Sequence, residues 1–75
     1  MQIHKHHEIL KKFGARVRQE RLKSGISQED LAGLASVHRT YIGMIERGEK
    51  NVTLSTMINI AGALEIDVID LIKGL

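Results

Sequence analysis

The short break between two amphipathic segments, residues 28–35 and 39–47, constrains the fold of this chain more than any other feature. Ser27 precedes the first segment and Asp30 follows three residues later, a spacing typical of the capping box that begins a helix. The break is too short for the chain to reverse between two helices, so we expect them to cross steeply with Val37 packed beneath both.

Helical patterns also cover the chain on both sides of this pair. Residues 7–24 are predicted to form a helix that ends at Gly25. Thr53 is a suitable N-cap for a fourth helix, and Asp67, followed three residues later by Asp70, begins a short fifth one. The side chains predicted to be buried in the four longer helices are Leu10, Phe13, Val17, Leu22, Leu31, Ala32, Ala35, Ile42, Ile45, Leu54, Met57, Ile60, Ala61 and Leu64.

The composition favours helix and a single domain. The chain has 75 residues, no proline and two aromatic residues, while strong helix formers dominate. It has no cysteine, which excludes disulfides and thiolate metal sites, and no apolar run approaches the roughly 20 residues that a membrane span needs. We therefore expect a compact all-α domain of five helices, located in the cytoplasm.

Charges are divided unevenly along the chain. Residues 1–50 contain ten Lys and Arg against six Asp and Glu, whereas residues 51–75 contain one against three. The net charge of +2 is too small to indicate nucleic acid by itself. The asymmetry nevertheless predicts that the first part of the chain meets an anionic partner and that the second part does not.

The outward side of the segment 39–47 carries side chains suited to DNA. Once Ile42 and Ile45 are assigned to the core, the remaining face holds cations, a hydroxyl and apolar tips, with no carboxylate expected on it. A helix fits the major groove, where arginine can donate two hydrogen bonds to guanine and methyl groups can contact thymine. The residues of this face are Arg39, Thr40, Gly43, Met44 and Arg47, with Tyr41 at its edge.

Two stretches, ISQEDLA and VHRTYIGMIERG, resemble the helix-turn-helix of the Cro and phage-repressor family, also called the XRE family. The resemblance extends from about Phe13 to Leu71 and includes FGARVRQERLKSG in the first helix. Within the family, HRTYI followed by IERG and NVTL is most similar to the controller proteins of restriction-modification systems. The resemblance implies a lambda-repressor-like fold and a homodimeric regulator that binds double-stranded DNA and controls its own transcription.

The resemblance also implies roles for individual residues. Arg39 is the main reader of bases. Gln28, in the first turn of its helix, bonds a backbone phosphate with the help of the positive helix N-terminus. The residues implied to contribute to groove contact are Thr40, Tyr41 and Met44, and those implied to meet phosphates from the far side are Arg47, Lys50 and Asn51.

Three residues depart from the family pattern. Ser36 stands in the turn where glycine is usual, which adds some backbone strain. Gly43 stands where serine is common, so a possible DNA contact is missing and helix propensity falls by about 1 kcal/mol relative to alanine. His38 is a poor helix cap, which suggests that its ring serves DNA rather than stability.

An ion pair inside the domain is also implied by the resemblance. Glu46 faces inward beside the first helix, where it pairs with Arg21. Removal of either partner would leave an unpaired charge in a partly buried position. We therefore expect alanine at either residue to unfold the domain rather than to change its specificity.

The C-terminal part has more apolar residues than one buried face uses. In a domain this small such an excess indicates an interface, and residues 58–75 are predicted to form a two-fold dimer. The dimer would set two recognition helices about 34 Å apart, one turn of DNA. The alternative is that these side chains complete the core. The predicted interface residues are Ile58, Ile66, Val68, Ile69, Ile72 and Leu75.

Enzyme activity, cofactors, metals and small-molecule ligands are not expected. No Ser, His and Asp arrangement is placed to form a catalytic site, and a chain this short has little room for a substrate pocket. The histidines His4, His6 and His7 in HKHH have only Glu8 nearby to complete a set of metal ligands.

The sequence thus predicts a sequence-specific transcriptional regulator that acts as a homodimer on a pseudo-palindromic operator. Two alternatives remain open. One is an antitoxin whose C-terminal surface also binds a toxin, and the other is an interaction module that keeps the fold without binding DNA. The distinguishing feature is the helix face, because an interaction module need not keep Arg39, Arg47 and Lys50 together without acids between them.

Overall fold

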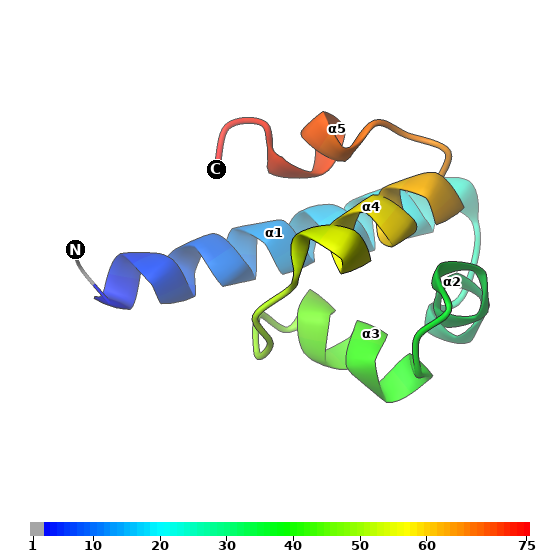
Figure 1. Ribbon diagram of the computed structural model, residues 1–75, viewed down its shortest axis with the longest axis horizontal. Helices are drawn as coiled ribbons and strands as arrows, with labels where there is room; N and C mark the ends of the chain where they lie inside the picture. Colours follow the sequence, from blue (N-terminus) through cyan, green and yellow to red (C-terminus); the bar gives the residue numbers. More distant parts are fainter. Residues whose placement is uncertain (1–2) are drawn as a thin grey trace.

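The computed structural model describes residues 3–75, with side chains from His6 onward (Figure 1). Five helices follow one another: α1 (Ile3–Ser24), α2 (Gln28–Ala35), α3 (Arg39–Glu46), α4 (Leu54–Ala63) and α5 (Val68–Ile72). No strand occurs within residues 3–75. Helices α1 and α4 cross the middle of the molecule, with α3 on one side and α5 on the other (Figure 1). The predicted all-α fold of five helices is confirmed.

Side-chain hydrogen bonds mark the three helix starts for which the sequence predicted a cap. Ser27 Oγ accepts a hydrogen bond from Asp30 N at 2.9 Å, and Asp30 Oδ2 accepts one from Ser27 N at 3.1 Å. The hydroxyl of Thr53 caps α4, and Asp70 Oδ2 accepts from Asp67 N at the start of α5. These bonds satisfy amide groups that have no partner inside a helix, and they confirm the predicted starts.

The turn between α2 and α3 makes the two helices cross steeply. Ser36 adopts the left-handed backbone conformation, with φ 59° and ψ 41°, which glycine adopts without strain and serine does not. Val37 donates its backbone N–H to Ala32 O at 3.0 Å and packs against the core. In Figure 1, α2 is seen almost along its axis while α3 runs across the view. The predictions for Ser36 and Val37 are therefore confirmed.

The first helix extends further than the sequence predicted. It begins at Ile3, about one turn before residue 7. Ile9, Leu10 and Phe13 line a groove of about 340 Å³ together with residues of the loop between α3 and α4, of α4 and of α5. In the added turn, His6 Nε2 lies 2.8 Å from Asn51 Oδ1 of the loop between α3 and α4, a contact that the local sequence pattern does not reveal.

The core lies between α1, α2, α3 and α4, and α5 closes it. Two predicted core residues lie on the surface instead, Leu22 with 53% and Leu54 with 64% of its area exposed. Arg21 takes the inward position in the last turns of α1, so its neighbour Leu22 points outward. Leu54 only begins α4, and Val52 from the preceding loop packs against the core instead. The buried apolar side chains are Phe13, Val17, Leu31, Ala32, Ala35, Ile42, Ile45, Ile60, Ala61, Leu64 and Leu71.

Arg16 fastens the short helix α5 to α1. Its Nη1 donates to Asp70 O at 2.8 Å, and its Nη2 donates to Lys73 O at 3.0 Å. The last carbonyls of a helix lack donor partners within the helix. The guanidinium therefore caps the C-terminal end of α5 and holds this helix against the domain.

Candidate nucleic-acid interface

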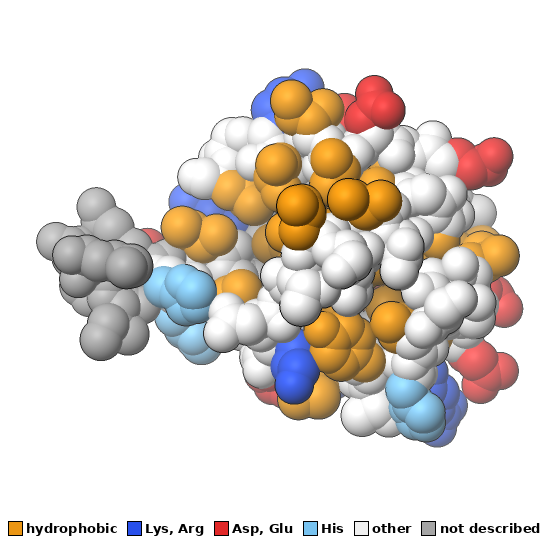
Figure 2. Space-filling model, in the orientation of Figure 1, with side chains coloured by type: hydrophobic (Ala, Val, Ile, Leu, Met, Phe, Trp, Pro, Cys, Tyr) orange, Lys and Arg blue, Asp and Glu red, His pale blue; other side chains and the backbone are white. Residues whose placement is uncertain are grey.

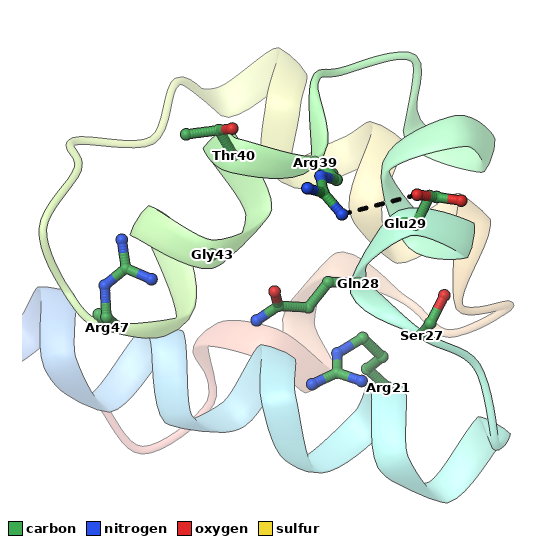
Figure 3. Close-up of a pocket in the computed structure, with 8 residues that line it drawn as sticks. All are labelled: Arg21, Ser27, Gln28, Glu29, Arg39, Thr40, Gly43 and Arg47. Atoms are coloured by element: carbon green, nitrogen blue, oxygen red, sulfur yellow. Dashed lines mark ion pairs between the residues drawn. The ribbon is translucent and has the colours of Figure 1, made fainter.

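A cleft of about 660 Å³ between α2 and α3 brings together many of the residues predicted to contact DNA (Figure 3). Its lining residues are Arg21, Ser27, Gln28, Glu29, Arg39, Thr40, Gly43 and Arg47. Arg39, Thr40 and Arg47 are exposed, as the helical pattern predicted, whereas Tyr41 and Met44 are half-buried. Residues from the start of α2 and from one face of α3 thus line one shared space.

The ring of His38 caps α3. Its Nδ1 accepts a hydrogen bond from Thr40 N at 3.1 Å. The nitrogen that accepts this bond carries no proton, so in the neutral ring the proton is on Nε2. The prediction that His38 does not serve helix stability was wrong, because the ring replaces the hydroxyl or carboxylate of an ordinary cap. Contact of His38 with DNA stays a prediction.

Two carboxylates lie beside the predicted DNA-contacting arginines, although the sequence pattern predicted a face without acids. Arg39 Nη1 is 3.8 Å from Glu29 Oε2 across the cleft (Figure 3), and Arg47 Nε is 3.1 Å from Glu49 Oε1. The prediction missed them because Glu29 reaches α3 from α2 and Glu49 from the following loop. All four side chains are more than half exposed, and such pairs contribute only about 0–1 kcal/mol. The arginines can therefore exchange these partners for an anion at little cost.

Arg21 lines the cleft and forms the predicted ion pair with Glu46. Arg21 Nε donates to Glu46 Oε2 at 2.7 Å, Nη2 donates to Glu46 Oε1 at 3.0 Å, and Nη1 donates to Ile26 O at 3.0 Å. The hydrogen bond to Glu46 raises the pKa of Arg21, its negative charge adds to this, and burial opposes both. Arg21 therefore stays charged and joins α1 to α3.

Gln28 is tied to the same carboxylate. Its Nε2 donates to Glu46 Oε1 at 3.1 Å, a bond that the sequence did not predict. Figure 3 shows the side chain between Arg47 and Arg21. An amide nitrogen has two hydrogens, so one remains to donate to a phosphate. The bond to Glu46 thus orients the group that we predicted to contact DNA.

Gly43 is buried rather than exposed, which corrects its predicted place on the outer face. A Cβ at this position would lie 3.1 Å from Arg47 Nη1 and 3.6 Å from Gln28 Oε1. The side chains of Arg47 and Gln28 therefore cover the backbone of α3 here. Glycine allows the Arg47 guanidinium to lie close to the helix. The absence of a side chain at position 43 therefore affects the surface through the position of Arg47.

The loop after α3 carries two more of the predicted phosphate contacts. Lys50 Nζ lies 5.7 Å from the centre of the Tyr41 ring, within the range of a cation–π interaction. Asn51 Oδ1 lies 2.8 Å from His6 Nε2. Neither contact was predicted, because both depend on how the loop folds back onto α3 and α1.

The predicted dimer residues divide into two groups. Ile58, Ile69 and Ile72 are exposed, with 52%, 59% and 42% of their area accessible. Ile66, Val68 and Leu75 instead pack in part against the core, as in the alternative we considered. Figure 2 shows hydrophobic side chains gathered over α4 and α5. Leu54 and Ile9 are also exposed apolar residues, although neither was among the predicted dimer residues.

The described residues contain no cluster that could hold a metal ion. Where side chains are described, no three His, Cys, Asp or Glu residues come together. His6 and His7 lie in α1, and the side chain of His4 is outside the described residues. Within residues 3–75, no helix is both long and apolar enough to cross a membrane.

The arrangement of α2, a tight turn and an exposed α3 matches a known family. The family described as helix-turn-helix matches residues 17–71 of this chain. The chain belongs to this helix-turn-helix family, and it is of the XRE type. The resemblance seen in ISQEDLA and VHRTYIGMIERG is thereby confirmed, and the family makes the chain a DNA-binding regulator rather than an enzyme.

Two relatives of this chain are control proteins. The chain is 54% identical to control protein C.SmaI of Serratia marcescens over 52 residues, which are 69% of this chain and 62% of that protein. It is 51% identical to control protein C.BamHI of Bacillus amyloliquefaciens over 61 residues, 80% of this chain and 75% of that one. The chain thus spans less than two thirds of C.SmaI but three quarters of C.BamHI.

A solved structure gives the same result for the fold. The restriction-modification controller protein C.AhdI from Aeromonas hydrophila superposes with a TM-score of 0.86 and 44% sequence identity. The match covers 88% of this chain and 96% of C.AhdI. The predicted similarity to controller proteins is therefore confirmed in sequence and in structure.

Proposed function

We propose that this helix-turn-helix protein regulates transcription as a homodimer that binds a pseudo-palindromic operator overlapping its own promoter. The observation that carries the proposal is the position of Arg39, exposed in the first turn of α3 and directed into an open cleft. A guanidinium in this position can donate two hydrogen bonds to guanine in the major groove. Sequence recognition by Arg39 follows from this chemistry.

Phosphate binding is the second part of the proposal. Arg47 and Lys50 are exposed beyond the C-terminal end of α3, and Gln28 lies at the N-terminus of α2. The first amide groups of a helix attract anions, and the remaining hydrogen on Gln28 Nε2 can donate to one. Phosphate contacts on two sides of α3 would fix its register, while Arg39 would read the sequence.

The dimer is supported by the apolar surface over α4 and α5 (Figure 2). Ile58, Ile69 and Ile72 are exposed there, and α5 lies on the side of α1 and α4 opposite to α3 (Figure 1). A two-fold axis through this surface would leave both copies of α3 free and present them about one DNA turn apart. Similarity to control proteins supports the autoregulatory role and a place in the bacterial cytoplasm.

Footprinting on the DNA directly upstream of the protein's own coding sequence tests this function. We expect two protected half-sites related by approximate symmetry, with centres about 10 base pairs apart. Arg39→Ala serves as the control that keeps the fold but removes the base reader. No protection by the unaltered protein, or equal protection of unrelated DNA, would overturn the proposal.

The interaction module is the second candidate, and the ion pairs of Arg39 with Glu29 and of Arg47 with Glu49 favour it. Carboxylates next to these arginines reduce the positive charge of the surface around α3, so this surface attracts DNA less strongly. The two functions differ in their response to salt, because DNA binding releases counterions and weakens steeply as salt increases. A complex that is captured from cells and survives high salt would indicate the module, or the antitoxin, instead.

A further inference from the structure

We propose that His6, outside the segment that matches the family, positions Asn51 for contact with a DNA phosphate. The proposal rests on the proposed DNA-binding function and adds to it a residue from the first turns of α1. His6 Nε2 and Asn51 Oδ1 are 2.8 Å apart, although the two residues are separated by 45 positions. Both side chains are exposed, so the bond does little for the core.

The backbone brings α1 and the loop between α3 and α4 into direct contact. Gly14 of α1 lies against α3, where a Cβ would come within 2.8 Å of Glu46 O. Gly48 begins the loop with φ +74°, and a Cβ there would lie 2.8 Å from Lys11 Cα. The loop therefore starts against the backbone of α1, and three residues later Asn51 meets His6. The close approach of Gly48 to α1 and the contact of Asn51 with His6 place this loop, and Gly14 places α3 beside them.

The chemistry of the bond determines how Asn51 is presented. Its Oδ1 accepts, so His6 Nε2 must carry the hydrogen, as it does in one neutral tautomer and in the charged ring. The acceptor half of the amide is thereby occupied. The Nδ2 group keeps its hydrogens and is the half that can donate to a phosphate oxygen. In this arrangement His6 holds Asn51 with its donor group available to an anion.

The cation next to Asn51 is held by a different contact. Lys50 Nζ is placed over the Tyr41 ring on α3, whereas Asn51 is fixed from α1. Neighbouring phosphate-binding groups are therefore supported by separate elements. A change at His6 should affect Asn51 while leaving Lys50 in place.

Binding to two DNA duplexes tests the proposal, one with the footprinted operator and one with the same bases scrambled. His6→Ala should weaken binding to both by about three- to tenfold, the value of one hydrogen bond, because a phosphate contact is independent of sequence. Asn51→Ala should give a similar loss, and the double variant should lose no more than either single one. His6→Gln can donate from a similar position and should restore binding.

Controls separate positioning from a structural effect. His7→Ala changes the neighbouring exposed ring of α1 and should bind like the unaltered protein. Thermal unfolding and sedimentation equilibrium should be the same for His6→Ala and for the unaltered protein. The inference is overturned if His6→Ala binds normally, if its loss multiplies with that of Asn51→Ala, or if weaker dimerisation accounts for the loss. Failure of the unaltered protein to bind either duplex would overturn the proposed function itself, and this inference with it.

Discussion

The guanidinium of Arg21 on α1 donates to both carboxylate oxygens of Glu46 on α3, at 2.7 Å and 3.0 Å. Only 9% of the Arg21 side chain and 2% of the Glu46 side chain are exposed. Gln28 donates to the same carboxylate from α2, so three helices meet at one ion pair. The surface that faces the candidate DNA site is therefore built on a buried charge network that also holds the domain together.

Alanine at either Arg21 or Glu46 should destabilise the fold. Each variant leaves one charge buried without its partner, which costs about 3–5 kcal/mol, a large part of the roughly 5–15 kcal/mol that holds a small domain folded. Urea unfolding followed by circular dichroism measures the change. The double variant Arg21→Met with Glu46→Leu leaves neither charge and should be more stable than the single variants. Single variants as stable as the unaltered protein would contradict this role.

Arg39→Ala and Lys50→Ala should affect DNA binding in different ways. Loss of the base reader should reduce operator affinity by about 1–3 kcal/mol and relax sequence preference. Loss of Lys50 should weaken binding to all sequences alike and reduce the salt dependence. Fluorescence anisotropy with operator and scrambled duplexes at several salt concentrations separates the two effects. An unchanged ratio of the two affinities in Arg39→Ala would show that Arg39 does not read bases.

Features set by neighbours in the chain could be predicted from the sequence. Ser27 and Asp30, and likewise Asp67 and Asp70, are three residues apart, and this spacing alone is enough for a capping box. The αL conformation at Ser36 agrees with the strain expected from the family resemblance, in which glycine is usual at this place in the turn. Such features depend on local geometry, which the final packing hardly changes.

Contacts between distant elements could not be predicted in this way. Glu29 reaches Arg39 because of the angle at which α2 and α3 cross. The residue pattern of α3 alone cannot predict this ion pair. His6 and Asn51 meet because the loop after α3 lies on α1. Exposed ion pairs and single hydrogen bonds of this kind leave no periodic signal in the sequence.

Arg16→Ala should loosen α5 without unfolding the rest of the domain. The guanidinium donates to Asp70 O and Lys73 O, and its loss should cost about 1–3 kcal/mol because both carbonyls lose a charged donor. Hydrogen exchange should become faster in α5 and remain slow in α2 and α3. Arg18→Ala, which changes an exposed arginine of the same helix, is the matched control. Equal protection of α5 in both variants would contradict the role of Arg16.

The capping box at α2 should make stability depend on pH in the acid range. Hydrogen bonds from the backbone N–H and then the side chain of Ser27 hold the pKa of Asp30 below its usual 3.8. Because the folded pKa is the lower one, the charged cap stabilises the fold above pH 3.8, and this contribution is lost as the pH falls through the lowered pKa. The free energy of unfolding, measured with urea on both sides of this range, should fall less steeply with decreasing pH for Asp30→Asn, because asparagine does not titrate. Parallel pH curves for the two proteins would refute the prediction.

Ile69→Asp should separate the proposed dimer while leaving the monomer helical. Ile69 is 59% exposed on α5, so its replacement disturbs little of the core, but a charge buried between two copies should weaken the dimer by about 2–4 kcal/mol. Sedimentation equilibrium should show a monomer, and circular dichroism should show unchanged helix content. Leu22→Asp is the matched control, because Leu22 is 53% exposed but lies on α1 outside the predicted interface. A dimer that persists in Ile69→Asp, or one that dissociates equally in Leu22→Asp, would mean that the two copies do not meet through α5.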